Sequence, residues 1–415
     1  MSLACASLIA FSLSLAPEAE SAAAPEWNQW RGPNRDAISK ETGLLKKWPE
    51  GGPALLWEAS GIGAGFSTVS IKDGRIFTQG DRQGRSHILA LDYGTGKELW
   101  AVPTGDAFRG GYDDHGPRGT PTIDGDVLYA LNVHGDLYCL ETASGKKRWS
   151  MNILEKFQGK NPEWKISESP LVVGDRLIVT PGGPDATIVA LDKKTGDTLW
   201  TSKGLSDPPA YSSCILVDAA GVKQVVNLTH KGIAGVALDD GRFLWRYDRV
   251  ANDVASIATP VHKDGEIFTT TFYDAGCALI RLKPAGEGKV AAEEVYFSRD
   301  LMNHHGGAVL VDGHIYCYHK DRDLKCLEWK TGKVKWSERK SVGKCSLFYA
   351  DGCLYALSQE GVVGLIEVTP EKYKELSRFK LPEHGEEPSW AHPVISGGRL
   401  FIRTDNKLRC YEVKG

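Results

Sequence analysis

Charged, imidazole and aromatic side chains stand just before a series of short apolar runs in this sequence. Their positions are Phe66, Arg118, Glu168, Tyr211, Asn303, His304, His305, Lys344, Trp390 and His392. Guanidinium and ammonium groups bind anions, imidazole moves protons or ligates metals, and aromatic rings stack on flat ligands. If the runs bring these side chains to one cavity, they form a binding site for a polar ligand that is flat or ring-shaped.

Four of these side chains are candidates for catalysis, namely His304, His392, Arg118 and Glu168. A histidine base beside an arginine suits proton abstraction next to a carboxylate or a carbonyl, as in a lyase. The candidate ligand-binding residues are Tyr211, Asn303, His305, Lys344, Trp390, Phe66 and, on a preceding loop, His115. A structural alternative stays open, in which Arg118, Lys344 and Glu168 neutralise one another across a water-filled channel.

The histidines alone do not predict a metal site. His304 and His305 are adjacent, so on a strand their side chains point to opposite faces. One of them could join His392 and His115 in a set of three imidazoles, but the sequence offers no carboxylate to orient such ligands. We therefore expect no bound metal.

The stretch ALDYGTGKELW, residues 90–100, indicates which elements position these side chains. Diverged copies of it end at Trp149, Trp200, Trp245 and Trp336. Each copy predicts a short strand, a polar turn around glycine and a second strand that ends on a large aromatic residue. One supersecondary unit is therefore repeated along the chain.

A second hairpin precedes each copy of this stretch. Its turn often carries Asp-Gly, the pair expected where both turn residues need positive φ. The pairs stand at 73–74, 124–125, 264–265, 312–313 and 351–352. Together the two hairpins form a four-stranded antiparallel unit.

Eight such units follow one another with a period of about 45 residues, which is typical of the blades of a β-propeller. The fifth unit ends near Phe297 and the seventh near Phe379, without tryptophan. The eighth is one strand short, and we expect residues 53–60 to supply that strand and close the ring. The sequence thus predicts an all-β, eight-bladed propeller as a single domain over residues 53–415.

The segments before the ring differ from it. Residues 1–24 are apolar and small-residue-rich, as in an export signal, which predicts a periplasmic or secreted protein. Residues 25–52 have no strand periodicity and predict an irregular arm lying on the ring. We expect Trp27, Trp30 and Trp48 to anchor this arm by burial. Arg31 and Arg35 could reach a ligand, but a structural role is favoured for both.

The charge composition of the chain limits the classes of binding partner that can be expected. Charged residues make up 25% of the chain and the formal net charge is −3, so nucleic acid and anionic membranes are not favoured. No transmembrane segment is predicted. Long polar connections that emerge on one face of the ring offer a surface for a protein partner. Among the nine cysteines, Cys317 and Cys326 could face each other across a hairpin, either as two buried thiols or as a disulfide.

The repeat A-x-D-x-x-T-G-x-x-x-W resembles the tryptophan-docking repeat of the PQQ-like, or quinoprotein, eight-bladed propellers. The resemblance covers nearly all of the chain after residue 24. The stretches WNQWRGPNRD, GPRGTPTIDG, SESPLV, NHHGG and WAHPV are similar to those of exported bacterial PQQ-like repeat proteins. The resemblance implies the fold, but fold does not decide function.

Two branches of this family imply different functions. PQQ-dependent alcohol or sugar dehydrogenases hold PQQ with calcium, and the BamB-type lipoprotein of outer-membrane assembly is a scaffold without a cofactor. The dehydrogenases carry adjacent cysteines, which this sequence lacks, and calcium ligands for which only Glu168 and Asn303 could be offered. Our leading interpretation is a polar axial site for a small or oligomeric, carbohydrate-like ligand, with the dehydrogenase second and the scaffold third.

Overall fold

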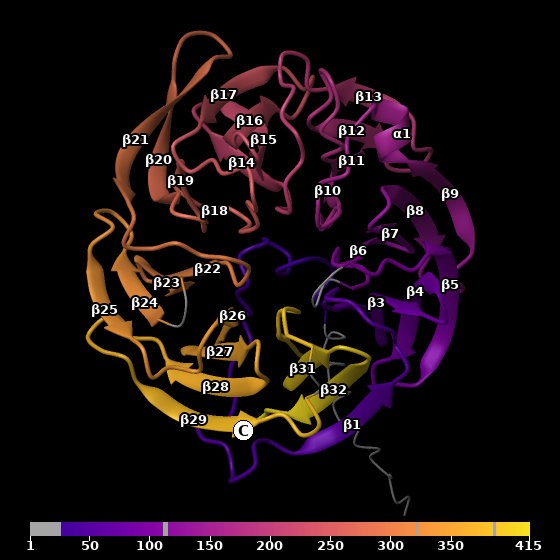
Figure 1. The fold of residues 1–415 in the computed structure, drawn as a ribbon, viewed down its shortest axis with the longest axis vertical. Coiled ribbons are helices and arrows are strands. Elements are labelled where there is room, and N and C mark those ends of the chain that lie inside the picture. Colours follow the sequence, from indigo (N-terminus) through magenta and orange to yellow (C-terminus); the bar gives the residue numbers. More distant parts are fainter. Residues whose placement is uncertain (1–25, 111–114, 321–322, 385–386) are drawn as a thin grey trace, which may run out of the picture.

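The computed structural model describes residues 26–110, 115–320, 323–384 and 387–415. Within them, eight four-stranded antiparallel sheets stand around one axis as the blades of a propeller (Figure 1). Residues 1–24, the predicted export signal, lie outside the described part of the chain. The predicted eight-bladed fold is confirmed.

Each blade begins with a strand beside the axis. These innermost strands are β2 Ser70–Lys72, β6 Thr122–Asp124, β10 Leu171–Val173, β14 Ile215–Ala219, β18 Val261–Lys263, β22 Ala308–Val311, β26 Cys345–Ala350 and β30 Val394–Ser396. The second strands are β3 Arg75–Arg82, β7 Val127–Leu131, β11 Arg176–Val179, β15 Val222–Thr229, β19 Glu266–Thr271, β23 His314–His319, β27 Cys353–Ser358 and β31 Arg399–Thr404.

The outer half of each blade is the hairpin made by the tryptophan-containing repeat. Its first strands are β4 Arg85–Asp92, β8 Asp136–Glu141, β12 Val189–Asp192, β16 Gly232–Ala237, β20 Gly276–Pro284, β24 Asp323–Glu328, β28 Val362–Glu367 and β32 Lys407–Glu412. The outermost strands are β5 Glu98–Asp106, β9 Lys147–Asn152, β13 Thr198–Thr201, β17 Phe243–Tyr247, β21 Val290–Ser298, β25 Val334–Glu338, β29 Glu375–Lys380 and β1 Leu55–Ser60.

One short helix, α1 Ile153–Phe157, follows β9 in the described ranges. The side chain of Asn152 caps it by accepting a hydrogen bond from the backbone N–H of Glu155 over 2.9 Å. No helix in the part of the chain that the structure covers has the length and apolar character to cross a membrane.

The inner hairpins turn at Asp-Gly in four of the five predicted places. Asp73 and Gly74, for example, have φ of 50° and 69°, the left-handed conformation that this pair adopts at low cost. The prediction is wrong at 124–125, because Asp124 ends β6 and the turn residues are Gly125 and Asp126. The hairpin itself is kept, since Asp124 pairs with Val127.

In several blades the repeated tryptophan joins the blade to the next one. Trp100 of the first blade donates its indole N–H to the carbonyl of Thr142 over 3.1 Å, in the turn of the second blade. A Cβ on Gly145 of that turn would lie 2.9 Å from the Trp100 ring, so only glycine lets the ring dock there. Trp57 on Gly96, Trp149 on Gly196 and Trp200 on Gly241 repeat this contact.

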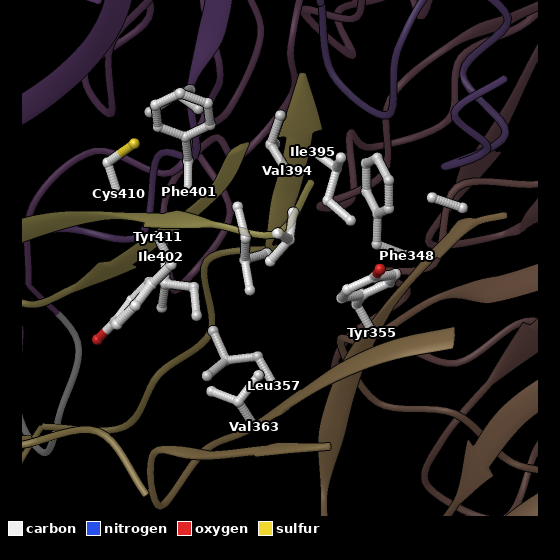
Figure 2. Packing of buried hydrophobic residues seen from close by; sticks show 14 of the residues in the cluster. Phe348, Tyr355, Leu357, Val363, Val394, Ile395, Phe401, Ile402, Cys410 and Tyr411 are labelled. Atoms are coloured by element: carbon white, nitrogen blue, oxygen red, sulfur yellow. The ribbon is translucent and has the colours of Figure 1, made fainter. Parts of the chain in front are cut away.

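The last blade is closed as predicted by a strand from the other end of the chain. β1 pairs with β32 antiparallel, with Leu55 opposite Tyr411 and Ser60 opposite Lys407. Closure leaves no unpaired blade edge where the chain ends meet. Beneath it lies the largest apolar cluster, which includes Phe348 and Tyr355 of the seventh blade and Phe401 of the eighth (Figure 2).

The arm crosses the axis of the ring (Figure 1, indigo). The Trp27 amide donates to the carbonyl of Ile71 in the first blade, and residue 38 forms a bridge with Tyr349 in the seventh. Between them, buried Arg35 donates to the carbonyls of Ser169, Pro170 and Cys214 in the third and fourth blades. Backbone carbonyls next to the innermost strands thus accept the hydrogen bonds of the Arg35 guanidinium. Sequence patterns could not predict these contacts.

Cys317 and Cys326 are buried free thiols. In the β23–β24 hairpin Cys317 pairs with Lys325 and Cys326 with Tyr316, so the two side chains are one register position apart. The predicted alternative of a cross-strand disulfide is wrong, and that of two buried thiols is confirmed. Asp321 and Arg322, between the two strands, lie outside the described ranges.

Candidate functional site

A cavity of about 310 Å³ opens at the axis, above the point where the arm crosses it. Seven of the predicted site residues line it, and each stands just before an innermost strand. They are Phe66, Arg118, Tyr211, His304, His305, Trp390 and His392. Because the blades converge on the axis, residues that are far apart in sequence meet at this cavity, which we call the axial pocket.

Aromatic rings form much of the wall of the axial pocket. Trp390 packs against Phe66 with ring centroids 4.9 Å apart, and against His305 at 5.4 Å. On another part of the wall Trp164 packs against Tyr211 at 5.9 Å. These rings present apolar faces on which a ring-shaped ligand can stack.

Arg118 brings a fixed positive charge to the wall. One of its Nη atoms donates to the carbonyl of Trp164 over 2.7 Å, and its guanidinium lies 5.7 Å from the centre of the Phe66 ring. Burial lowers the pKa of Arg118 to about 10, so the side chain stays charged at neutral pH. The backbone carbonyl and the aromatic ring orient this charge.

Three histidines meet on one side of the pocket. The Nδ1 atoms of His304 and His305 are 3.3 Å apart, and His304 Nε2 is 3.3 Å from the hydroxyl of Tyr273. Nε2 of His392 lies 3.3 Å from the carbonyl of His305. Burial, together with the positive charges of Lys344 and Arg31, lowers the pKa of His304 and of His392 to about 3.

Neutral imidazoles with such low pKa values are weak bases. General-base catalysis is most efficient when the pKa of the base lies near the working pH. The pocket as it stands therefore suits hydrogen bonding better than proton abstraction. The catalytic roles assigned from sequence to His304, His392 and Arg118 stay predictions.

Glu168, the fourth predicted catalytic residue, does not line the axial pocket. Its carboxylate accepts hydrogen bonds from the backbone N–H and the hydroxyl of Thr180, both over 2.7 Å, and from the thiol of Cys214 over 3.4 Å. Burial raises the pKa of Glu168 to about 7. The hydrogen-bond partners of Glu168 are thus Thr180 and Cys214. The structural alternative considered from sequence, in which Glu168 neutralises Arg118 and Lys344, does not describe these contacts.

Three predicted ligand-binding residues also stand outside the lining of the pocket. Asn303 accepts a hydrogen bond from the Gly307 amide over 2.9 Å, which holds the backbone of the pocket in place. Lys344 lies 5.8 Å from the centre of the Trp390 ring. His115 is 3.8 Å from a carboxylate oxygen of Glu387, on the loops.

Sequence patterns missed the residues that the arm and the long connections supply. Trp30 and Arg31 come from the arm, and Trp164, Thr259 and Tyr273 are further residues of the lining. Trp30 packs edge-on against His392 with ring centroids 4.6 Å apart. Because the arm has no periodicity, the sequence indicated that its tryptophans are buried but not which blades its tryptophans and arginines contact.

Calcium with PQQ, the cofactor pair that the resemblance implies, does not fit the described residues. Calcium takes six to eight oxygen ligands, chiefly carboxylates and carbonyls. No Asp or Glu stands among the residues that line the axial pocket in the described ranges, where no set of three His, Cys, Asp or Glu side chains gathers as metal ligands either. Glu168 and Asn303 are already held by Thr180 and by Gly307.

The fold and the pocket define an eight-bladed propeller with an axial cavity. Residues 84–338 match the family described as outer membrane protein assembly factor BamB, and the chain belongs to this PQQ-like propeller family. It is 22% identical to the BamB of Moranella endobia (strain PCIT), over 63% of this chain and 67% of that protein.

Other relatives match only a part of each chain. The sequence is 31% identical to the serine/threonine-protein kinase AfsK of Streptomyces griseus over 38% of this chain. It is 29% identical to the dehydrogenase subunit of the alcohol dehydrogenase (quinone) of Gluconacetobacter polyoxogenes over 32% of this chain. The matches span 18% and 20% of those two proteins.

Solved structures share the fold at low sequence identity. BamB from Moraxella catarrhalis superposes with a TM-score of 0.60 at 16% identity, over 84% of this chain and 94% of that one. The quinohemoprotein alcohol dehydrogenase from Comamonas testosteroni superposes with a TM-score of 0.65 at 12% identity, over 96% and 82%. Proteins whose names indicate different functions therefore share this ring.

Proposed function

We propose that this protein is an exported binding protein whose axial pocket takes a small or oligomeric polar ligand of the carbohydrate class. The observation that carries the proposal is the pairing of aromatic rings with fixed polar groups around one cavity. Trp390 and Phe66 offer apolar faces, and Arg118 and His304 offer hydrogen-bonding groups beside them. Sugars present the same combination, a C–H face on each ring and hydroxyls at its edge.

The size and lining of the cavity support a small ligand. A volume of about 310 Å³ lies at the lower end of the range usual for ligand pockets. The hydroxyls of Ser167, Ser213 and Thr259 add acceptors and donors between the rings. Such side chains bind sugar hydroxyls without a metal or a cofactor.

Neutral histidines favour binding over turnover. With pKa values of about 3, His304 and His392 are uncharged at neutral pH and can accept or donate hydrogen bonds. A quinoprotein-type dehydrogenase is the second candidate only because of the relatives, since the lining lacks calcium ligands. A protein partner on the loop face, as the BamB family name suggests, is compatible with the pocket.

A periplasmic or secreted location is part of the proposal. It is supported by the signal-like composition of residues 1–24 and by relatives whose name places them in outer membrane assembly. Detection of the protein in a periplasmic or culture fraction after mild osmotic shock checks this. Retention of the full-length chain in the cytoplasmic fraction would contradict it.

A thermal-shift screen tests the proposed function. We expect neutral or acidic oligosaccharides to raise the melting temperature of the wild type without added PQQ, because a ligand that binds the folded state stabilises it. The shift should vanish in Trp390→Ala and persist in Phe243→Ala, an exposed aromatic on an outermost strand. Dye reduction with an alcohol or sugar after addition of PQQ and calcium would support the dehydrogenase instead.

A further inference from the structure

We infer that the floor of the axial pocket, formed by Arg31, His305, Gly307 and His392, is a subsite for an anionic group of the ligand, a carboxylate or a phosphate. This inference rests on the proposed function and narrows its ligand to acidic members of the class. The floor is distinct from the wall that Arg118 and Trp390 form. Its central residue, Arg31, comes from the arm.

The floor contains three buried nitrogens without hydrogen-bond partners. They are Nη1 of Arg31, Nε2 of His305 and Nδ1 of His392. The three residues are only 3%, 8% and 6% exposed, and all of them line the axial pocket. Buried polar atoms in folded proteins are nearly always paired, so Nη1 of Arg31, which can only donate, indicates a missing acceptor. Nε2 of His305 donates in one of the two tautomers of that ring, whereas Nδ1 of His392 is an acceptor, because Nε2 of the same ring donates to the carbonyl of His305.

Gly307 brings two of these nitrogens to one place. A Cβ on Gly307 would lie 2.5 Å from Arg31 Nη1 and 3.8 Å from His392 Cε1. Any side chain here would therefore cover the guanidinium and press on the imidazole. Asn303 keeps this bare backbone in position by accepting the Gly307 N–H, which makes it a positioning residue for the floor.

The charge of Arg31 is not neutralised by the groups that hold it. Its other nitrogens donate to the backbone carbonyls of Arg35, Asp36 and Ala308. The Asp36 carboxylate lies close enough to favour the charged form of Arg31, and it also accepts the backbone N–H of Ile38 over 3.0 Å. The lining residues in the described ranges include no Asp or Glu, so the cavity itself offers the guanidinium no counter-charge.

Anionic oxygens complement this floor in shape and in charge. A carboxylate or phosphate oxygen can accept from Nη1 of Arg31 while a second accepts from a histidine nitrogen in its protonated tautomer. Hydrogen bonds to charged partners are about twice as strong as neutral ones. A hydroxyl of a neutral sugar can also accept from Nη1 of Arg31, but it brings no negative charge to the guanidinium and therefore binds more weakly.

Calorimetric titration of the wild type with matched sugars tests the inference. The probes are galactose, galacturonate and galactose 6-phosphate, or their short oligomers. We expect at least one of the two acidic probes to bind about tenfold more tightly than galactose, as the loss of a charged hydrogen bond implies. The better acidic probe shows whether the floor selects carboxylate or phosphate.

Two arm variants locate the effect. Arg31→Gln should remove the preference for the acidic probe, whereas Arg35→Gln, which alters a buried arginine outside the lining, should keep it. Circular dichroism confirms that each variant is folded, and His305→Gln replaces Arg31→Gln if the latter is not. Equal affinities of the wild type for acidic and neutral probes would overturn the anionic floor but leave the proposed function standing. Binding of none of the sugars would overturn both.

Discussion

The indole N–H of Trp30 donates a hydrogen bond to the hydroxyl of Thr259 over 2.9 Å. This contact joins the arm to the fifth blade across the axis of the ring, and both residues line the same cavity. The arm is therefore part of the pocket as well as an anchor for the chain. Its two buried arginines differ in use, because Arg35 holds the blades together and Arg31 faces the cavity.

Replacing Arg35 should destabilise the ring. Arg35→Met leaves the carbonyls of Ser169, Pro170 and Cys214 without their donors, so we expect the free energy of unfolding to fall by about 3 kcal/mol. Denaturant unfolding followed by tryptophan fluorescence measures the loss. The exposed Lys47→Met on the same arm should change stability by less than about 0.5 kcal/mol. Equal stability of the two variants would contradict the structural role of Arg35.

Two glycine substitutions separate the contribution of tryptophan docking to stability from that of backbone strain. Gly241→Ala places a Cβ 2.4 Å from the Trp200 ring at a φ of 74°, so we expect a loss of more than about 2 kcal/mol and a changed tryptophan emission. Gly74→Ala has a similar φ of 69° but no atom within 4 Å, and it should cost only about 1 kcal/mol. Equal losses in thermal unfolding would show that docking adds nothing beyond strain.

Glu168 should make stability depend on pH. Its pKa is raised by burial to about 7 in the folded protein and returns to its ordinary value near 4.5 on unfolding. The stabilising effect of the protonated form is therefore complete below that ordinary pKa and is lost as pH rises through 7, by roughly 3 kcal/mol. Melting temperatures of wild type and Glu168→Gln between pH 5 and 8 check this. Parallel pH profiles of the two proteins would contradict it.

The ring could be predicted from sequence because its determinants are local and repeated. Asp73 and Gly74 set a hairpin, and Trp100 with Gly145 sets the spacing of two blades, each within a few dozen residues. The course of the arm could not be predicted in this way. Arg35 is held by carbonyls that are 134 to 179 residues away, and carbonyls carry no sequence signature.

The candidate site was predictable in position but not in detail. The start of each innermost strand must face the axis, so Phe66, His304 and Trp390 were found from the repeat alone. Glu168 occupies an equivalent position, yet its carboxylate turns to Thr180 instead of the cavity. Side-chain direction at a strand start depends on local backbone bends, which a repeat pattern does not encode.

The central claim, that the axial pocket is the ligand site, is tested most directly by calorimetric titration of wild type and Trp390→Ala with the best oligosaccharide from the thermal-shift screen. Trp390 contacts both Phe66 and His305 at the cavity, so its removal takes away the largest stacking surface. We expect an affinity at least tenfold lower in the variant, which circular dichroism should show to be folded in the absence of sugar. Unchanged affinity in a folded Trp390→Ala would place the ligand elsewhere and contradict the claim.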